Sequence, residues 1–157
     1  MTMTRRDALV GFTALASALT AGLPAAAEAP EEQQLPDLGP AVFHWDELKP
    51  VKSPVGAHAQ LCKQPTATID QLEMHVGLLN PGEMSHPPHR HVNEELIILK
   101  EGTCETLSNG NWVRVEAGDV VFNASNSLHG FRNIGPWPAL YHVINWSPDQ
   151  SRLAHKS

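Results

Sequence analysis

Short runs of alternating apolar and polar residues, separated by turn residues, dominate the chain from residue 41 onwards. In the segment 71–78 every second residue is apolar, which is typical of a strand with one buried face. No stretch after residue 30 shows the period of an amphipathic helix. The pattern predicts strands at Ala41–Trp45, Ala57–Cys62, Ile69–Leu79, Leu96–Lys100, Thr103–Leu107, Trp112–Glu116, Val120–Asn123 and Leu140–Trp146.

Turn signals lie between these runs. The pair Asn109 and Gly110 joins two alternating segments, and it predicts a two-residue hairpin because both turn positions need a positive φ. The 13 Pro and 11 Gly of the chain suit a fold with many turns. Short strands with frequent turns predict an all-β barrel or sandwich. No internal repeat or second domain is visible in the sequence.

The residues before the first strand have the pattern of an export signal. Arg5 and Arg6 precede an uncharged, apolar stretch from Ala8 to Leu23, and the three alanines 25–27 offer a small-residue cleavage site. The stretch is too short and too rich in small residues for a membrane span. Residues 4–9 resemble the twin-arginine export motif, although Ala8 stands where Phe is usual. We therefore expect a cleaved, twin-arginine-like signal peptide at residues 1–27 and a periplasmic or secreted protein, with the general secretory route as the alternative.

The rest of the chain divides into three expected parts: a disordered acidic spacer at 28–40, a barrel at 41–147 and a C-terminal tail at 148–157. The net charge of −6 and the lack of any Lys/Arg run argue against binding of nucleic acid or an anionic membrane. An exported protein would permit a disulfide between Cys62 and Cys104. Two separate, half-buried thiols that act as small apolar residues are an equal alternative.

The candidate chemistry is concentrated in the His-rich segment 86–95. On an extended backbone, residues i and i+2 point to the same side, so His89 and His91 can both face inward. Glu95 adds a carboxylate, but it does not share their phase, so a turn or bulge is needed around residues 92–93. Imidazole and carboxylate groups are common ligands of divalent transition metals.

The wider spacing resembles the two motifs of the cupin family. The first, G-x5-H-x-H-x3,4-E-x6-G, is matched with one extra residue after its first glycine, at Gly82, His89, His91, Glu95 and Gly102. The second, G-x5-P-x-G-x2-H-x3-N, is matched at Gly118, His129 and Asn133, with Ala124 and Asn126 at its Pro and second Gly.

The resemblance implies a cupin-type double-stranded β-helix, a jelly-roll barrel of six to ten short antiparallel strands. It also implies one divalent metal ion bound by His89, His91, Glu95 and His129. We expect Mn or Fe, with Zn, Ni or Co as alternatives. A protein that folds before export would take up its metal in the cytoplasm, away from periplasmic Cu and Zn.

Three residues are candidates for acid–base catalysis. Glu95 is a ligand and a possible base, while His86 and His142 are the ionisable groups that we expect nearest to the metal. In the alternative without a catalytic role, His86 lies at the barrel rim and His142 lines the barrel behind the metal ligands. Glu94 is expected to face the other side of the strand as a solvated residue, and the alternative is a register shifted by one residue in which Glu94 is the ligand. The other imidazoles are assigned to the surface or to packing: His44, His58, His75 and His155. The four Trp are assigned to the core or a dimer interface: Trp45, Trp112, Trp137 and Trp146.

The resemblance does not select a reaction, because cupins include decarboxylases, dioxygenases, isomerases and ligand sensors. We favour a metal-dependent enzyme of the dioxygenase or decarboxylase type, acting on a small oxygen-rich organic molecule. The alternative is a non-catalytic cupin that binds or senses a small ligand. In both cases we expect a small-molecule ligand, no nucleic acid, no membrane after signal cleavage, and a homodimer paired through a strand edge.

Overall fold

The computed structural model describes residues 35–148, in which all strand pairs are antiparallel. A single 3-10 turn, η1 (Trp45–Glu47), is the helical element of these residues. The strands are β1 (Val51–Ser53), β2 (Gly56–Thr66), β3 (Ile69–Leu79), β4 (Glu94–Glu101), β5 (Thr103–Ser108), β6 (Asn111–Glu116), β7 (Val120–Asn123), β8 (Phe131–Asn133) and β9 (Ala139–Pro148).

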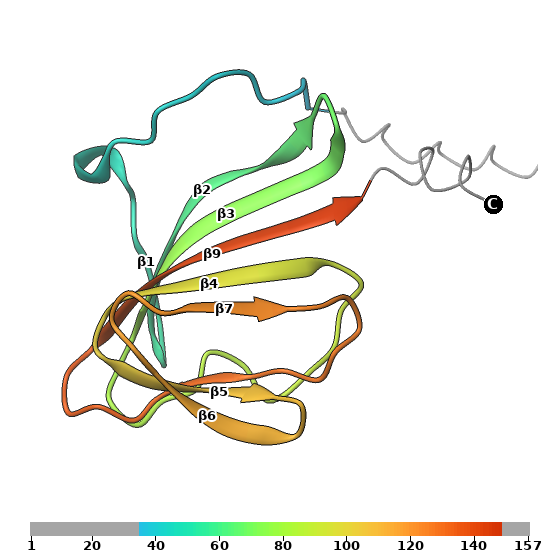
Figure 1. Cartoon of the computed structure of the whole chain (residues 1–157). Helices are drawn as coiled ribbons and strands as arrows, with labels where there is room; N and C mark the ends of the chain where they lie inside the picture. Colours follow the sequence, from blue (N-terminus) through green and yellow to red (C-terminus); the bar gives the residue numbers. More distant parts are fainter. Residues whose placement is uncertain (1–34, 149–157) are drawn as a thin grey trace, which may run out of the picture. The chain divides into compact units, whose positions relative to one another are not determined.

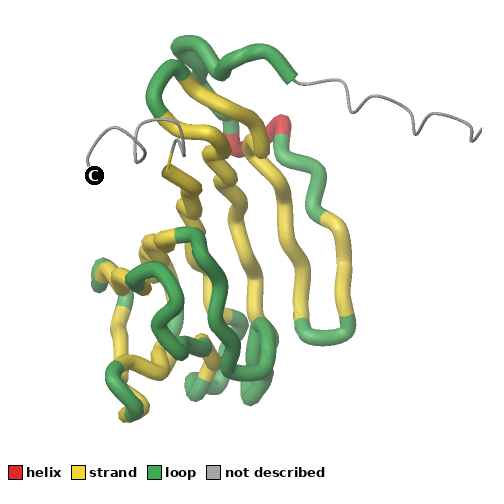
Figure 2. The backbone as a smooth tube through the Cα atoms, turned by 90° about the vertical axis from the view of Figure 1, so that its right-hand side faces the viewer, coloured by secondary structure: helices red, strands yellow, loops and turns green. Residues whose placement is uncertain are grey.

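The strands form two sheets that share one core (Figure 1). The larger sheet has the order β1-β2-β3-β9-β4-β7 and the smaller one the order β6-β5-β8. Leu79 and Leu99 of the larger sheet pack with Cys104 and Phe131 of the smaller one in the buried core. Turned by 90°, the larger sheet is seen as a row of neighbouring strands joined by loops (Figure 2). The expected all-β, double-stranded β-helix barrel is confirmed.

Most predicted strands are present, but one predicted strand is absent and two short strands were not predicted. The strand predicted at Ala41–Trp45 is wrong, because this segment is irregular up to η1. The prediction also missed β1 and β8, each of which has three residues and is too short to show a period. Residues 35–40 of the expected spacer have no regular structure, and the Leu38 N–H donates to the Pro65 carbonyl at 2.8 Å.

Several predictions fall on residues outside the described part of the chain. The signal peptide at 1–27, its twin-arginine motif and His155 in the tail lie there. Within residues 35–148, no helix is long and apolar enough to cross a membrane.

The hairpin predicted at Asn109 and Gly110 is confirmed. Their φ angles are 49° and 80°, and Ser108 pairs directly with Asn111 across the turn. Both central residues therefore occupy the left-handed region that this turn requires.

Strand β3 has two faces of different character, and the apolar one is directed away from the barrel interior. Val76, on the apolar face, borders an outer groove together with Trp45 and Leu48 near η1. The opposite face carries Glu73 and His75 into an interior cavity. Alternation therefore predicted the strand correctly, while the inward face is the more polar one.

The prediction that the tryptophans fill the core is wrong, whereas the cysteines follow one of the two alternatives that the sequence left open. None of the four Trp lies in the buried core, whose aromatic pair is Phe131 and Tyr141 with ring centroids 5.0 Å apart. Trp137 is 76% exposed. Cys62 and Cys104 are both buried free thiols, and burial raises the pKa of Cys104 to about 12.

Candidate metal centre

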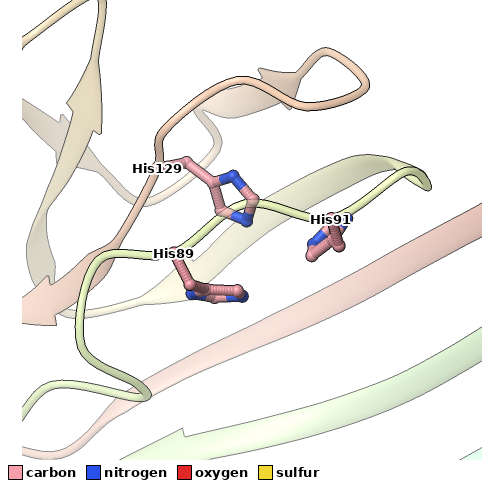
Figure 3. A group of neighbouring side chains, drawn as sticks. All are labelled: His89, His91 and His129. Atoms are coloured by element: carbon pink, nitrogen blue, oxygen red, sulfur yellow. The ribbon is translucent and has the colours of Figure 1, made fainter.

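Three histidines from two separate segments converge on one point (Figure 3). His89 and His91 precede β4, and His129 precedes β8. One ring nitrogen from each lies within 4.8 Å of the others. The backbone sets this arrangement, because His89 and His129 each donate an N–H to the other's carbonyl, at 3.0 and 3.1 Å.

A second set of hydrogen bonds ties the two histidine segments together. The Asn126 N–H donates to the His91 carbonyl at 2.8 Å, and Arg90 donates to the Asn126 carbonyl at 2.6 Å. The Ser125 hydroxyl donates to the Val92 carbonyl at 2.7 Å. Asn126 has a φ of 58°, so it adopts the left-handed conformation for which the motif usually has glycine. The polar turn at 125–127 thus has a structural role in aligning the histidines.

Each histidine ring is oriented by a carbonyl of its own loop. The Nδ1 atoms lie 3.1, 3.0 and 2.9 Å from the carbonyls of Pro87, Asn93 and Ser127, for His89, His91 and His129 respectively. When Nδ1–H donates to these carbonyls, each Nε2 keeps its lone pair. Histidine ligands of metals commonly show this pattern, in which the second nitrogen fixes the tautomer and the ring orientation.

Glu95 completes the cluster. Its Oε2 lies 3.8 Å from Nε2 of His91, and its Oε1 lies 3.9 Å from Nε2 of His129. Residues 92–93 form the bend that changes the phase between the histidines and this carboxylate. Glu94 faces the opposite side of β4, where it accepts a hydrogen bond from Trp146 at 3.1 Å. The register expected for Glu95 and Glu94 is the one observed.

The surroundings of His129 fit a metal ligand. Its Nε2 is buried and has no hydrogen-bond partner within residues 35–148. An unpaired buried nitrogen is costly, and a bound cation would satisfy it. Burial is the main cause that lowers the pKa of His129, which keeps the ring neutral and able to coordinate. A cavity of about 190 Å³ lies against the cluster and leaves room for a small ligand.

Asn123 on β7 holds the carboxylate, since its Nδ2 donates to Glu95 Oε1 at 2.9 Å and the residue is 4% exposed. An Asn123→Ala variant is expected to bind Mn²⁺ about 10- to 100-fold more weakly, because the carboxylate loses the contact that orients it. Competition with a chromogenic chelator measures this. Unchanged affinity in a folded variant would show that Asn123 does not position Glu95.

The structure brings one of the two further candidate histidines to the centre. His86 is exposed and lines the cavity, with its ring centroid 5.7 Å from that of His89. His142 is not brought there. It pairs with Val76 and Ile98 on the outer face of the larger sheet, while its neighbours on β9 line the cavity. This placement leaves His142 without a contact to the metal centre.

Two cavity residues were missed by the sequence analysis. His75 was assigned to the surface or to packing, yet it lines the cavity from β3, and Tyr141 lines it from β9. Alternation places His75 on the same face of β3 as Leu79, but only the structure shows that this face is the one in the core.

The metal-free protein is expected to lose stability as the pH falls below about 6.5. Burial lowers the pKa values of His129 and His142 in the folded protein. Below pH ~6.5 the unfolded chain therefore binds more protons than the folded one, and the free energy of unfolding decreases until the lowered pKa values are passed. Urea unfolding at pH 7, 6 and 5 measures this, with a His142→Gln variant showing a shallower dependence. A free energy of unfolding that rises with acidification would contradict it.

Comparison with known proteins agrees with this fold. Residues 75–145 match the family model described as Cupin domain. No curated protein matches the chain. Together with the fold, the family match supports the cupin superfamily for this chain.

Several solved structures have the same fold. A predicted oxalate decarboxylase from Thermotoga maritima gives a TM-score of 0.56 at 20% identity, covering 68% of this chain and 99% of that one. KdgF from Halomonas sp. gives 0.58 at 16% identity, covering 73% and 99%. The polyketide cyclase RemF from Streptomyces resistomycificus gives 0.56 at 22% identity, covering 69% and 80%. The TM-scores establish a shared fold, whereas sequence identities this low leave the reaction open.

Proposed function

We propose that the chain is an exported cupin that acts as a metal-dependent enzyme on a small oxygen-rich organic molecule, of the dioxygenase or decarboxylase type. One divalent ion is bound by His89, His91, Glu95 and His129. The observation that carries the proposal is the convergence of three imidazoles that backbone carbonyls orient, two of which have Nε2 within 3.9 Å of the Glu95 carboxylate.

The donor set suits Mn or Fe, which are common in open sites of mixed nitrogen and oxygen ligands. When bound, such an ion supplies a Lewis acid for a carboxylate or hydroxyl oxygen, or a site for O₂. Four protein ligands leave coordination positions for substrate. His86 stands at the cavity wall beside His89, where it can donate or accept a proton.

The predicted homodimer and export remain part of the proposal. Strand β7 is an edge of the larger sheet, and Val120 and Phe122 on it are 59% and 53% exposed. Exposed apolar residues on an edge strand favour pairing with a second copy. Light scattering is expected to give the dimer mass over a range of concentrations, and the monomer mass at every concentration would contradict the pairing.

The proposal is tested by reconstitution. Protein stripped with a chelator and titrated with Mn²⁺ or, without oxygen, with Fe²⁺ is expected to bind one ion per chain. The loaded protein is then screened for O₂ uptake and CO₂ release with small carboxylates and polyols. Metal-dependent turnover supports the enzyme. Reversible binding that leaves every compound unchanged would favour the ligand-binding alternative, and failure to bind either metal would reject the proposed site.

A further inference from the structure

A second chamber lies beside the metal centre. Its volume is about 400 Å³, within the range of pockets that bind small organic ligands. It shares five lining residues with the metal cavity, so the two are adjacent parts of one space: Glu73, His75, Ser85, His86 and Tyr141. A ligand bound at the metal centre can therefore extend into the chamber.

Tyr141 lies at the boundary between the two spaces. Its ring crosses β3 at Gly77, where any Cβ would collide with the phenol ring and hydroxyl. The glycine therefore makes room for a tyrosine at this position. The hydroxyl has no hydrogen-bond partner among residues 35–148, and burial raises the Tyr141 pKa to about 12. It is thus a protonated donor that is available to a ligand.

Glu73 and His75 form the adjoining wall on β3. One carboxylate oxygen of Glu73 is 3.1 Å from Lys63 Nζ, and the other is 3.8 Å from Nδ1 of His75. Lys63 pairs with Glu73 from outside the chamber. The lysine is exposed and does not line either space. His75 and Ser85 add hydrogen-bonding groups on the same boundary.

The lining of the chamber carries no lysine or arginine within the described part of the chain. Its polar residues include one carboxylate, Glu73, and three histidines: His58, His75 and His86. An anionic group placed here would lie near the Glu73 carboxylate without a lysine or arginine in the wall to pair with it, which is unfavourable. Hydroxyl groups, in contrast, find both donors and acceptors.

We propose that this chamber binds an uncharged, hydroxylated part of the substrate, whose oxygen-bearing end lies at the metal centre. Tyr141, Ser85 and His75 position that part by hydrogen bonds. The inference rests on the proposed function in one respect: the oxygen-bearing end of the substrate is taken to bind at the metal centre. It narrows the substrate class to molecules whose far end carries hydroxyls and no phosphate or second carboxylate.

Two probes with one carbon skeleton test the inference. D-gluconate has one carboxylate and a hydroxylated tail, whereas D-glucarate has a carboxylate at both ends. Titration of each probe against Mn²⁺-loaded protein, followed by the relaxation of the probe protons, reports binding near the ion. Gluconate is expected to bind at least tenfold more tightly than glucarate, because of the uncompensated far carboxylate. Equal or tighter binding of glucarate, or no binding of gluconate, would overturn the inference.

Matched variants locate the probe in the chamber. Tyr141→Phe keeps the ring and is expected to weaken gluconate binding about fivefold through loss of one hydrogen bond. Ser85→Ala should act in the same direction. His58→Lys places a cation in the chamber wall and is expected to raise the affinity for glucarate. Unchanged gluconate binding in both Tyr141→Phe and Ser85→Ala would contradict the assigned positions.

The metal content of each sample separates the two proposals. If Mn²⁺ binds in a one-to-one ratio but gluconate does not bind, or glucarate binds equally or more tightly, the chamber is rejected and the metal site stands. If Mn²⁺ does not bind, the proposed function fails, and saturation transfer to the metal-free protein tests the chamber alone. Transfer to gluconate that Tyr141→Phe reduces would support the chamber, and its absence would reject it.

Discussion

A His129→Ala variant is expected to bind Mn²⁺ at least a hundredfold more weakly than the parent chain. On the proposed assignment the substitution removes a direct ligand, so the loss should exceed the 10- to 100-fold effect of altering a supporting contact. The imidazole is 3% exposed and its Nε2 has no other partner within the described residues, so no neighbouring side chain replaces it. Equilibrium dialysis with metal analysis measures the change.

The matched control is His142→Ala, which removes an imidazole from the outer face of the same barrel. It is expected to keep the parent metal affinity, because His142 pairs with Val76 and Ile98 and does not line the metal cavity. Thermal unfolding of the metal-free variants verifies that both are folded. A folded His129→Ala protein that retains one ion per chain would contradict the ligand assignment.

An Asn133→Ala variant is expected to lower the free energy of unfolding by about 3 kcal/mol, roughly 1 kcal/mol for each of three hydrogen bonds. The side chain is 1% exposed. It donates to the carbonyls of Leu79 and Trp137 at 2.9 and 2.8 Å, and it accepts from the Gly135 N–H at 2.9 Å. Asn133 thereby joins the end of β8 to β3 and to the loop before β9, and alanine would leave buried backbone groups unpaired.

Urea unfolding of the metal-free protein measures this loss. Asn111→Ala is the control, because its exposed side chain makes one long hydrogen bond of 3.3 Å at the hairpin. The control is expected to change stability by less than about 0.5 kcal/mol. If Asn133→Ala is equally mild, then the three hydrogen bonds do not hold these segments together.

The sequence located the candidate metal cluster because its proposed ligands follow a local spacing. His89, His91 and Glu95 lie within seven residues, and the bend needed between them is present at residues 92–93. The fourth member, His129, came from the resemblance of the second motif. The carbonyl contacts that orient each Nδ1 could not be predicted, because they depend on loop conformations that no periodic pattern encodes.

Which face of a strand points inward was harder to predict. On β9, His142 and Tyr141 are adjacent, so a shift of one residue exchanges the side chain that reaches the cavity. The outer face of β3 is as apolar as a core face, and Val76 on it is only 6% exposed. Because both faces of these strands carry apolar residues, alternation alone predicted the strands but not their orientation.

The tryptophans, which lie outside the buried core, show a similar limit. Large aromatic residues are usually buried, but Trp112 lies against Arg132, whose guanidinium carbon is 4.1 Å from the ring centroid. Trp146 stacks on Phe122 at 6.5 Å on the outer face. The core is filled instead by Phe131, Tyr141 and aliphatic residues of both sheets.

Elemental analysis of the mature protein, expressed with its own N-terminal segment and purified from the native compartment, tests the central claim most directly. We predict about one Mn or Fe per chain in the parent protein and none in a His89→Ala variant prepared in parallel. A parent protein without stoichiometric metal would contradict the account, and the cavity would then belong to a metal-free ligand-binding protein.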